Sequence, residues 1–425
     1  MRRGSLAAML ALGMAVALAA SSMSLAATKL VLWHIQTTDP TLSIIDASVA
    51  RFRAAHPGVE VEVVPLQNDP YKVRLAVAMG AGDPPDVFIS WGGGPLEEYV
   101  KAGKVADLTP FLLKDDYIKR FPPAAMGPVT FGGRYYGVPV ENVAPALIWY
   151  NRAFWSRYGV SPPSTWDEFL AVANKFKGAG VIPVALANRT KWPGSMWYMY
   201  LVDRIGGEQA FRRAVERTGS FADPPFVKAG EEIQRLVDLG VFPPGFNGID
   251  WDTGGSRMLL YSGRAAMELM GSWQYQIVYG ENPEFFEDLD YFHFPTYPGG
   301  VGDPTNLIGT PGDNYYCIAA SSPNKELAFE LIQYLIDDVA VSRRIAAGKI
   351  PPVAGVENQL TDPVLRRLYM DFSRANHMQL WYDQYLPPEL GEVHKNTLQA
   401  VFGKTMTPLQ AAQEMEAAAR NYYGR

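Results

Sequence analysis

Apolar residues recur along the chain in short runs and alternating patterns that predict β-strands. Residues 29–33 (KLVLW) and 86–90 (DVFIS) are short apolar runs, and residues 59–65 (VEVEVVP) alternate between apolar and charged positions. Short apolar runs are typical of buried strands, and alternation is typical of a strand with one face on the core. We therefore predict three strands within the first 90 residues.

Helical periodicity fills the two gaps between these strands. Residues 41–55 place apolar side chains at i, i+4 and i+7, and a His-Pro-Gly stop follows them. Residues 71–79 have a helical spacing through Val73 and Val77. The order strand, helix, strand, helix, strand requires crossover connections, so the sequence predicts an α/β fold with a parallel sheet.

The segments that directly follow the first and third strands are the first candidates for a ligand site, because ligands of parallel sheets bind at the carboxyl ends of the strands. His34, Gln36 and Thr37 follow the first strand, and Trp91 and Gly92 follow the third. A structural turn or a solvent-facing role is the alternative for His34, Gln36 and Thr37. For the segment after the third strand, the glycines that begin at position 92 could serve only a tight turn or a close backbone approach. Both interpretations stay open at this point.

The first 26 residues have the order of a secretory signal peptide. Arg2 and Arg3 precede an uncharged run over residues 6–20, and the small residues Ser24 and Ala26 follow on either side of Leu25, with cleavage expected after Ala26. The arginine pair leaves twin-arginine export open beside general secretion. No cysteine follows the small residues, so no thiol is available there for a lipid anchor. We expect a periplasmic or secreted protein that does not insert into the membrane.

Composition and charge limit the function classes. The 425 residues are 48% hydrophobic, which allows two or three domains with substantial cores. The net charge of −6 becomes −8 without Arg2 and Arg3, so neither nucleic acid nor an anionic membrane is an expected partner. The single cysteine, Cys317, excludes an internal disulfide, and the five histidines are scattered. We expect no metal and no cofactor.

Four segments occur in the order and spacing found in the extracellular solute-binding proteins of ABC-type sugar importers, the group that includes maltodextrin-binding protein. They are residues 86–112 (DVFISWGGGPLEEYVKAGKVADLTPFL), 135–176 (beginning YYGVPVENVAPALIWYN), 263–275 (GRAAMELMGSWQY) and 315–337 (YYCIAASSPNKELAFELIQYLID). The resemblance covers essentially the whole mature chain. Residues 91–94 (WGGG) and 191–207 are most similar to members that bind xylo-oligosaccharides or other β-linked sugars.

This resemblance implies a periplasmic-binding-protein type II fold, in which two α/β lobes are joined by a hinge and hold the ligand in the cleft between them. The N-terminal lobe would comprise residues 27–139 and 313–348, and the C-terminal lobe residues 140–312 and 349–425. A ligand that contacts both lobes would favour the closed form.

The implied function is that of an extracytoplasmic receptor. It would capture a neutral mono- or oligosaccharide, with a xylo-oligosaccharide or another β-linked sugar as the best match, and deliver it to the permease subunits of an ABC transporter. We expect a monomer without catalytic residues. Two alternatives are an exported glycoside hydrolase, for which no carboxylate pair is marked in the sequence, and a receptor of the same fold for a non-sugar solute.

Sugar sites combine flat aromatic rings, which pack on the C–H faces of a pyranose, with polar side chains that bind its hydroxyl groups. Trp273 matches the family position that stacks on sugar, and Trp381 lies in a second such region. Core packing remains the alternative for each candidate tryptophan. Hydrogen bonding within the hinge remains the alternative for Glu141 and Asn142, which lie where the chain crosses between the lobes. Trp149, Trp155 and Trp166 are predicted to pack in the core. The candidate ligand-binding residues are His34, Gln36, Thr37, Trp91, Gly92, Glu141, Asn142, Trp192, Trp197, Trp251, Trp273, Asp313, Asn314, Trp381, Asp383 and Gln384.

Overall fold

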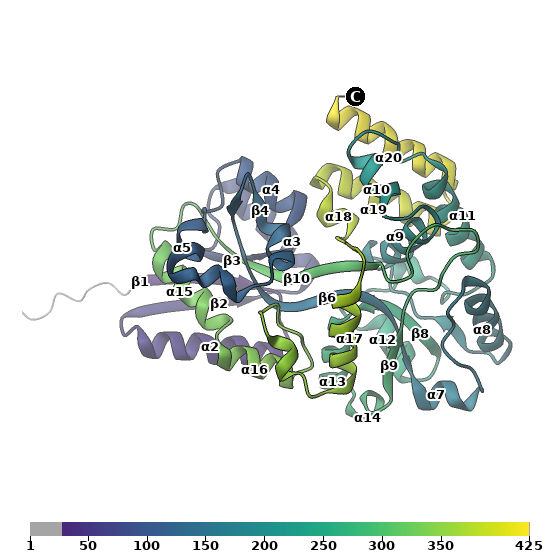
Figure 1. Cartoon of the computed structure of the whole chain (residues 1–425), viewed down its shortest axis with the longest axis horizontal. Coiled ribbons are helices and arrows are strands. Elements are labelled where there is room, and N and C mark those ends of the chain that lie inside the picture. The colour runs from purple at the N-terminus through teal and green to yellow at the C-terminus, as the bar shows by residue number, and fades with distance from the viewer. Residues whose placement is uncertain (1–27, 425) are drawn as a thin grey trace, which may run out of the picture.

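The computed structural model describes residues 28–424, and the predicted signal peptide (residues 1–26) lies outside them. The described chain forms two α/β lobes side by side (Figure 1). Two long strands, β6 (Val138–Asn151) and β10 (Leu307–Ile318), run between the lobes. We call the lobe that contains β1 the first lobe and the other the second lobe. The predicted α/β class with two lobes is confirmed, and the residue limits of each lobe stay a prediction.

The elements of the first lobe come from two separate parts of the sequence. They are β1 (Thr28–His34), α2 (Thr41–Ala55), β2 (Val59–Pro65), α3 (Asn68–Ala81), β3 (Val87–Ser90), α4 (Gly93–Lys101), α5 (Thr109–Leu113), α6 (Pro123–Met126), β4 (Thr130–Phe131), β5 (Arg134–Tyr135), α15 (Lys325–Leu335) and α16 (Asp338–Ala346).

The second lobe is the larger and contains most of the helices. Its elements are α7 (Arg152–Arg157), α8 (Trp166–Gly178), β7 (Ile182–Val184), α9 (Trp192–Gly206), α10 (Glu208–Val215), α11 (Pro224–Asp238), α12 (Gly255–Tyr261), β8 (Ala265–Gly271), α13 (Trp273–Glu281), α14 (Pro283–Phe286), β9 (Leu289–Phe292), α17 (Pro363–Arg374), β11 (Met378–Gln379), α18 (Tyr382–Tyr385), α19 (Pro388–Phe402) and α20 (Pro408–Tyr423).

One path of hydrogen-bonded strands passes through both lobes in the order β2-β1-β3-β10-β6-β8-β7. β1 is parallel to β2 and to β3, as the sequence predicts. β10 is antiparallel to both β3 and β6. The chain therefore leaves the first lobe along β6 and returns to it along β10, and these two strands form the hinge region.

The predicted helix over residues 71–79 is confirmed by α3. Tyr71, Leu75 and Met79 are buried, whereas Val73 and Val77 are 68% and 67% exposed. Apolar residues occupy every second position here, so the sequence offers two apolar helical faces, one through Tyr71, Leu75 and Met79 and one through Val73 and Val77. The Tyr71 hydroxyl decides between them, because it donates to and accepts from the backbone of β3 at 2.8 Å. The spacing through Val73 and Val77 therefore marks the exposed face of the helix.

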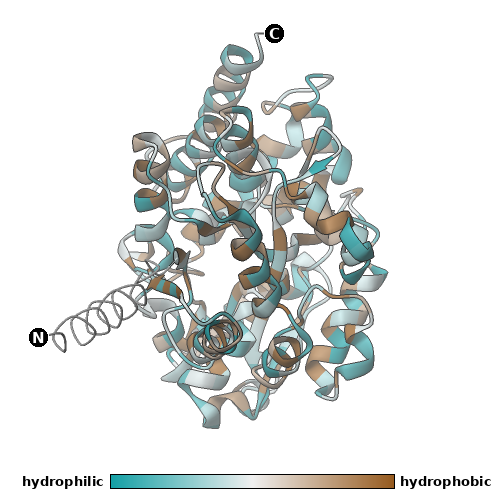
Figure 2. Cartoon of the chain, turned by 90° about the vertical axis from the view of Figure 1, so that its left-hand side faces the viewer, coloured by the Kyte–Doolittle hydropathy of each residue, from teal (hydrophilic) through white to brown (hydrophobic). Residues whose placement is uncertain are grey.

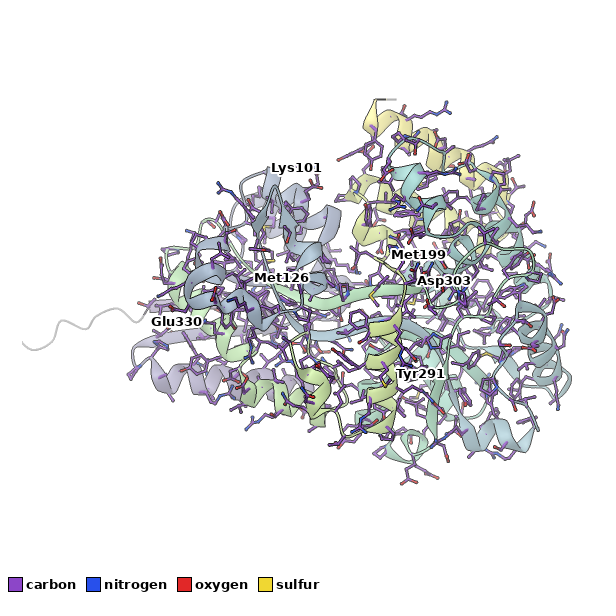
Figure 3. All side chains as sticks on the ribbon, viewed as in Figure 1. Lys101, Met126, Met199, Tyr291, Asp303 and Glu330 are labelled. Atoms are coloured by element: carbon purple, nitrogen blue, oxygen red, sulfur yellow. The ribbon has the colours of Figure 1, made fainter. Side chains whose placement is uncertain are left out.

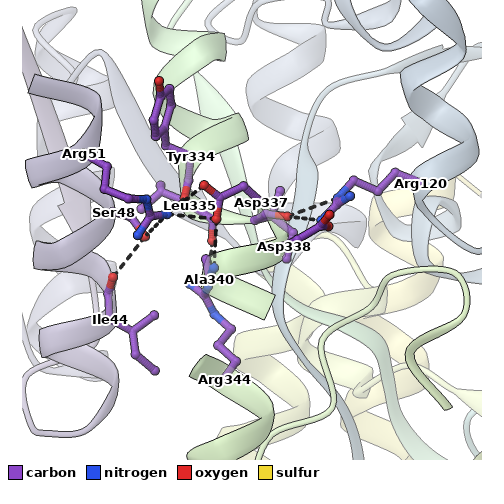
Figure 4. Close-up of polar contacts among 11 residues, drawn as sticks. Ile44, Ser48, Arg51, Arg120, Tyr334, Leu335, Asp337, Asp338, Ala340 and Arg344 are labelled. Carbon is purple, nitrogen blue, oxygen red and sulfur yellow. Dashed lines mark hydrogen bonds and ion pairs between the residues drawn. The ribbon is translucent and has the colours of Figure 1, made fainter. Parts of the chain in front are cut away.

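Charged contacts fasten the returning helices α15 and α16 to the first lobe (Figure 4). Arg51 of α2 donates to both carboxylate oxygens of Asp337 at 2.8 Å, and Arg120 pairs with Asp338 at 2.8 Å. Asp337 also accepts the backbone N–H of Ala340 at 2.8 Å and so caps α16. Helices α15 and α16, which follow β10, therefore pack with the first lobe.

The second lobe buries its apolar side chains between β8 and the surrounding helices. In Figure 2, where the first lobe faces the viewer, many helices of the chain carry hydrophobic residues on one face and hydrophilic residues on the other. Trp149, Trp155 and Trp166 are at most 1% exposed, which confirms that they pack in the core. Each indole N–H has a hydrogen-bond acceptor at 2.8–3.0 Å. These tryptophans are structural.

The hinge strands are irregular beside the cleft. Asp313 of β10 pairs with Asn142 of β6, and the register shifts on each side of this pair. Asn314 has a φ of +59°, a left-handed conformation that an asparagine tolerates. Irregularities of this kind bend a strand and re-aim its side chains. Both Asp313 and Asn314 line a pocket between the lobes.

Candidate ligand-binding cleft

A pocket with a cavity volume of ≈ 230 Å³ lies between the lobes, beside the hinge strands. Met199 of α9 lies on its second-lobe side (Figure 3). The lining residues are Ile35, Gln36, Thr37, Thr38, Gln67, Asn68, Lys72 and Trp91 from the first lobe; Asn142, Asp313, Asn314 and Lys349 at the crossings; and Trp192, Met196, Met199, Trp251, Asp252, Arg257, Trp273, Gln276, Ile277, Glu281, Trp381, Asp383 and Gln384 from the second lobe.

The first-lobe wall is built mainly from amide and hydroxyl side chains at the carboxyl ends of parallel strands. Gln36 and Thr37 follow β1, and Gln67 and Asn68 follow β2. Trp91 directly follows β3. Amide groups offer both donors and acceptors, and hydroxyl groups do the same. This wall can therefore bind a ligand that carries many hydroxyl groups.

The second-lobe wall contains four tryptophans in edge-to-face contact. The ring centroids of Trp192 and Trp251 are 5.0 Å apart, and those of Trp192 and Trp273 are 6.1 Å apart. Trp273 in turn lies 5.9 Å from Trp381. Edge-to-face pairs of this kind hold their rings in fixed orientations. The four indoles form one continuous aromatic surface, although they come from four separate parts of the sequence.

Gly271, the last residue of β8, allows Trp273 to occupy its place in this surface. A Cβ atom at position 271 would lie 2.2 Å from the indole ring of Trp273, far inside van der Waals contact. Gly271 is not among the glycines with positive φ, so its own backbone conformation does not require glycine. The close approach of the ring explains the residue.

Two cations lie over tryptophan rings at the pocket. The Nζ atom of Lys72 is 5.0 Å from the ring centroid of Trp91, and the guanidinium carbon of Arg257 is 4.9 Å from that of Trp251. Arg257 also donates two hydrogen bonds of 2.9 Å to Glu281. One face of each ring is thus already occupied, and the Arg257 charge is balanced by a carboxylate.

A buried ion cluster holds the first crossing in place. Arg344 donates to the two carboxylate oxygens of Glu141 at 3.0 and 3.2 Å, and Lys349 donates at 2.8 Å. The three side chains are 0–4% exposed. Burial alone would raise the pKa of Glu141, but the two cations outweigh it and lower the pKa well below its usual range. The carboxylate is therefore fully engaged inside the protein.

Asp313 lines the pocket next to this cluster. Burial raises the pKa of its carboxyl group to about 6; Lys349 opposes the rise and Glu141 adds to it. A carboxyl group with this pKa is mostly ionised at pH 7 and mostly protonated at pH 5. Asp313 thus changes between a hydrogen-bond acceptor and a donor within a mildly acidic range.

The family model of the bacterial extracellular solute-binding proteins matches residues 37–341, which is more than half of the chain. The chain belongs to this family. An ABC transporter extracellular-binding protein of Pyrococcus horikoshii is 31% identical over 65% of this chain and 62% of its own length, which is less than two thirds of that relative.

Solved structures of similar fold support the same assignment. A structure from a study of xylan utilization by Caldanaerobius polysaccharolyticus has a TM-score of 0.84 and 27% identity, and the match covers 92% of this chain and 99% of that one. A chitin oligosaccharide binding protein has a TM-score of 0.87 at 23% identity, with 94% and 100% covered, and shows the shared fold. Within residues 28–424, no helix is long and apolar enough to cross a membrane.

The pocket of this solute-binding protein brings together residues that are far apart in the sequence. The predicted candidates among its lining residues are Gln36, Thr37, Trp91, Asn142, Trp192, Trp251, Trp273, Asp313, Asn314, Trp381, Asp383 and Gln384. Their place in the pocket is a finding, and their contact with a ligand stays a prediction.

Four predicted candidates lie outside the lining of the pocket. His34 is fully buried, its Nδ1 atom accepts the N–H of Gln36 at 3.1 Å, and burial lowers its pKa to about 4. Trp197 is 0% exposed within the second-lobe core, where it packs on aromatic side chains. Glu141 is held in the ion cluster, and Gly92 packs against Pro128 of its own lobe. None of the four lines the pocket, and a role in ligand binding stays a prediction for them.

Several lining residues were not among the predicted candidates. They are Ile35, Thr38, Gln67, Asn68, Lys72, Met196, Met199, Asp252, Arg257, Gln276, Ile277, Glu281 and Lys349. The rule that places ligands at the carboxyl ends of strands identifies Gln67 and Asn68 when it is applied to the second strand as well. The Arg257 and Glu281 pair has no comparable local signal, because its members lie 24 residues apart on separate helices.

A serine and a histidine also form a close pair, which bears on the hydrolase alternative. Ser195 Oγ and His394 Nε2 are 2.6 Å apart. Both side chains are buried, at 1% and 4% exposure, and neither lines the pocket. Burial lowers the pKa of His394 to about 3, so its ring is neutral. This pair joins α9 to α19 and does not face the cleft.

Proposed function

We propose that this solute-binding protein is an extracytoplasmic receptor for a neutral mono- or oligosaccharide. The observation that carries the proposal is the pairing of a four-tryptophan wall with an opposite wall of amide and hydroxyl side chains. A pyranose ring has apolar C–H faces that pack on aromatic rings and a rim of hydroxyl groups that need hydrogen-bond partners. The two walls match these two sides of a sugar.

The charges around the pocket favour a neutral ligand over an anion. Arg257 is paired with Glu281, and Lys349 is paired with Glu141. Lys72 lies 3.5 Å from Asp69. A phosphate or carboxylate ligand would need to draw these cations away from carboxylates that already bind them. A sugar needs only the polar groups that remain.

The similar proteins support a sugar importer and narrow the first choice of ligand. One relative is an ABC transporter extracellular-binding protein, and one similar structure comes from work on xylan utilization. We infer that xylo-oligosaccharides or other β-linked sugars are the ligands to test first. The protein would act outside the cytoplasm as a monomer without enzymatic activity and deliver its ligand to an ABC permease.

Isothermal titration calorimetry tests this proposal directly. The ligands are xylotriose, cellotriose, chitotriose and maltotriose, with an amino acid mixture and a phosphate ester as non-sugar solutes. We expect one sugar series to bind with a dissociation constant of about 1 μM or tighter, or about 8 kcal/mol. Heat from a non-sugar solute alone would contradict the sugar assignment. New reducing ends after incubation with the trisaccharides would favour the hydrolase alternative instead.

A further inference from the structure

Three consecutive glycines at the start of α4 meet different parts of the molecule. A Cβ atom on Gly92 would lie 2.7 Å from the side chain of Pro128, within the first lobe. A Cβ atom on Gly93 would lie 2.0 Å from the carbonyl oxygen of Gln384, and one on Gly94 would lie 2.3 Å from that of Leu386. The second and third glycines thus permit a contact with the segment around α18.

This segment is fastened to the second lobe. The backbone N–H of Tyr382 donates to Met199 Sδ at 3.1 Å, and the ring of Tyr382 stacks on Phe211 at 3.7 Å between centroids. The same segment supplies three lining residues of the pocket, Trp381, Asp383 and Gln384. The glycines of α4 therefore touch, from the first lobe, the backbone of a second-lobe segment whose side chains face the ligand site.

A second contact between the lobes lies farther along α4. The Tyr422 hydroxyl of α20 is 3.4 Å from a carboxylate oxygen of Glu98. Glu98 is also bound to Lys101 at 3.1 Å and is partly exposed, so this contact alone is weak. Its position shows that the second lobe approaches α4 along much of its length and not only at the glycines.

We propose that Gly94, supported by Gly93, is a positioning residue for ligand capture. The absence of a side chain lets the start of α4 close onto the backbone at Gln384 and Leu386, and this contact sets the pocket-lining segment against a ligand held between the lobes. The inference rests on the proposed receptor function, because the contact matters only if the lobes close around a ligand.

Gly94 is the more informative of the two glycines. Its φ is not in the left-handed region, whereas Gly93 has a φ of +61°. An alanine at position 94 is therefore compatible with the backbone of the first lobe. The nearest atoms to its methyl group would be the carbonyl group of Leu386 and the nitrogen of Pro387, at 2.3–2.8 Å. These are backbone atoms that cannot rotate away, so the lobes would have to stay farther apart.

The test compares wild type with Gly94→Ala and with Gly80→Ala as the control. Gly80 lies in α3, and a Cβ atom there meets nothing within 4 Å. The probe is the trisaccharide, among xylotriose, cellotriose, chitotriose and maltotriose, that wild type binds most tightly. Calorimetry measures affinity, small-angle scattering measures the radius of gyration at saturation, and thermal unfolding measures the ligand-free proteins.

We expect Gly94→Ala to bind the probe roughly tenfold or more weakly. Its ligand-saturated radius of gyration should exceed that of wild type, and its ligand-free melting temperature should be unchanged. Gly80→Ala should match wild type in both affinity and radius. Wild-type affinity and radius in Gly94→Ala would overturn the inference, and so would a lowered ligand-free melting temperature, because that result places the contact in folding.

The sugar proposal can fail separately. If wild type binds only the amino acid mixture or the phosphate ester, the receptor is not a sugar receptor. Gly94→Ala and Gly80→Ala are then measured with that solute in place of the trisaccharide. Weaker binding and a larger ligand-saturated radius of gyration in Gly94→Ala would support the positioning role, and wild-type values of both would overturn it.

Discussion

Replacement of Trp273 by alanine separates ligand binding from folding most sharply. Trp273 lies in the pocket and is partly exposed, and its ring contacts Trp192 and Trp381 edge to face. An aromatic side chain buries about 150–250 Å² when fully covered. A sugar that covers one face would bury roughly half of this area, or about 80–120 Å².

The expected loss follows from this area. At about 25 cal/mol per Å², the lost contact is worth about 2–3 kcal/mol, which weakens binding about 30- to 150-fold. Trp273→Phe should retain part of the affinity, because a smaller flat ring remains. The fold should survive both changes, since the indole lines the pocket and is only partly buried.

Titration calorimetry with the tightest trisaccharide and urea denaturation of the free protein measure the two effects separately. Trp197→Phe is the matched control, because Trp197 is 0% exposed in the core. It should lower the free energy of unfolding by about 1–3 kcal/mol and leave the affinity of the folded protein unchanged. The reasoning is refuted if Trp273→Ala unfolds the protein, or keeps wild-type affinity with the fold intact.

Three further predictions follow from the cleft and the hinge. Gly271→Ala should weaken sugar binding in calorimetry, because its methyl group would displace the Trp273 ring; an unchanged affinity would mean that the ring position is unimportant. Glu141→Gln should lower the free energy of unfolding in urea by about 3–5 kcal/mol, because it leaves Arg344 and Lys349 buried without their carboxylate. The lowered pKa of Glu141 means that its contribution is present above about pH 4.5 and is lost as the pH falls through the folded-state pKa, so the variant should differ least from wild type in acid. Asp313 has the opposite sign. Its pKa of about 6 lies above the usual value of 3.8 for an aspartate, so its contribution to stability falls as the pH rises through this interval. Asp313→Asn should therefore gain stability relative to wild type between pH 5 and pH 7 in urea titrations, and an equal difference at both values would contradict the raised pKa.

The sequence by itself determined the elements and the family of this protein. Apolar periodicity predicted β1, α2, β2 and β3, because burial on one face of an element requires a regular spacing of apolar side chains. Four motifs in register indicated the two-lobed receptor, and the strand-end rule indicated Gln36, Thr37 and Trp91. These features depend on neighbours along the chain, and a sequence records such neighbours directly.

The tertiary structure decided what each candidate side chain touches. Trp192 and Trp197 are five residues apart on α9, yet the first lines the pocket and the second lies in the core, because they point to different faces of the helix. Glu141 and Asn142 are adjacent, yet Glu141 binds Arg344 more than 200 residues away. Gly94 lies in the first lobe and Leu386 in the second, yet they approach each other closely. Contacts over such separations depend on how the elements pack in space, and the local pattern of residues does not contain that information.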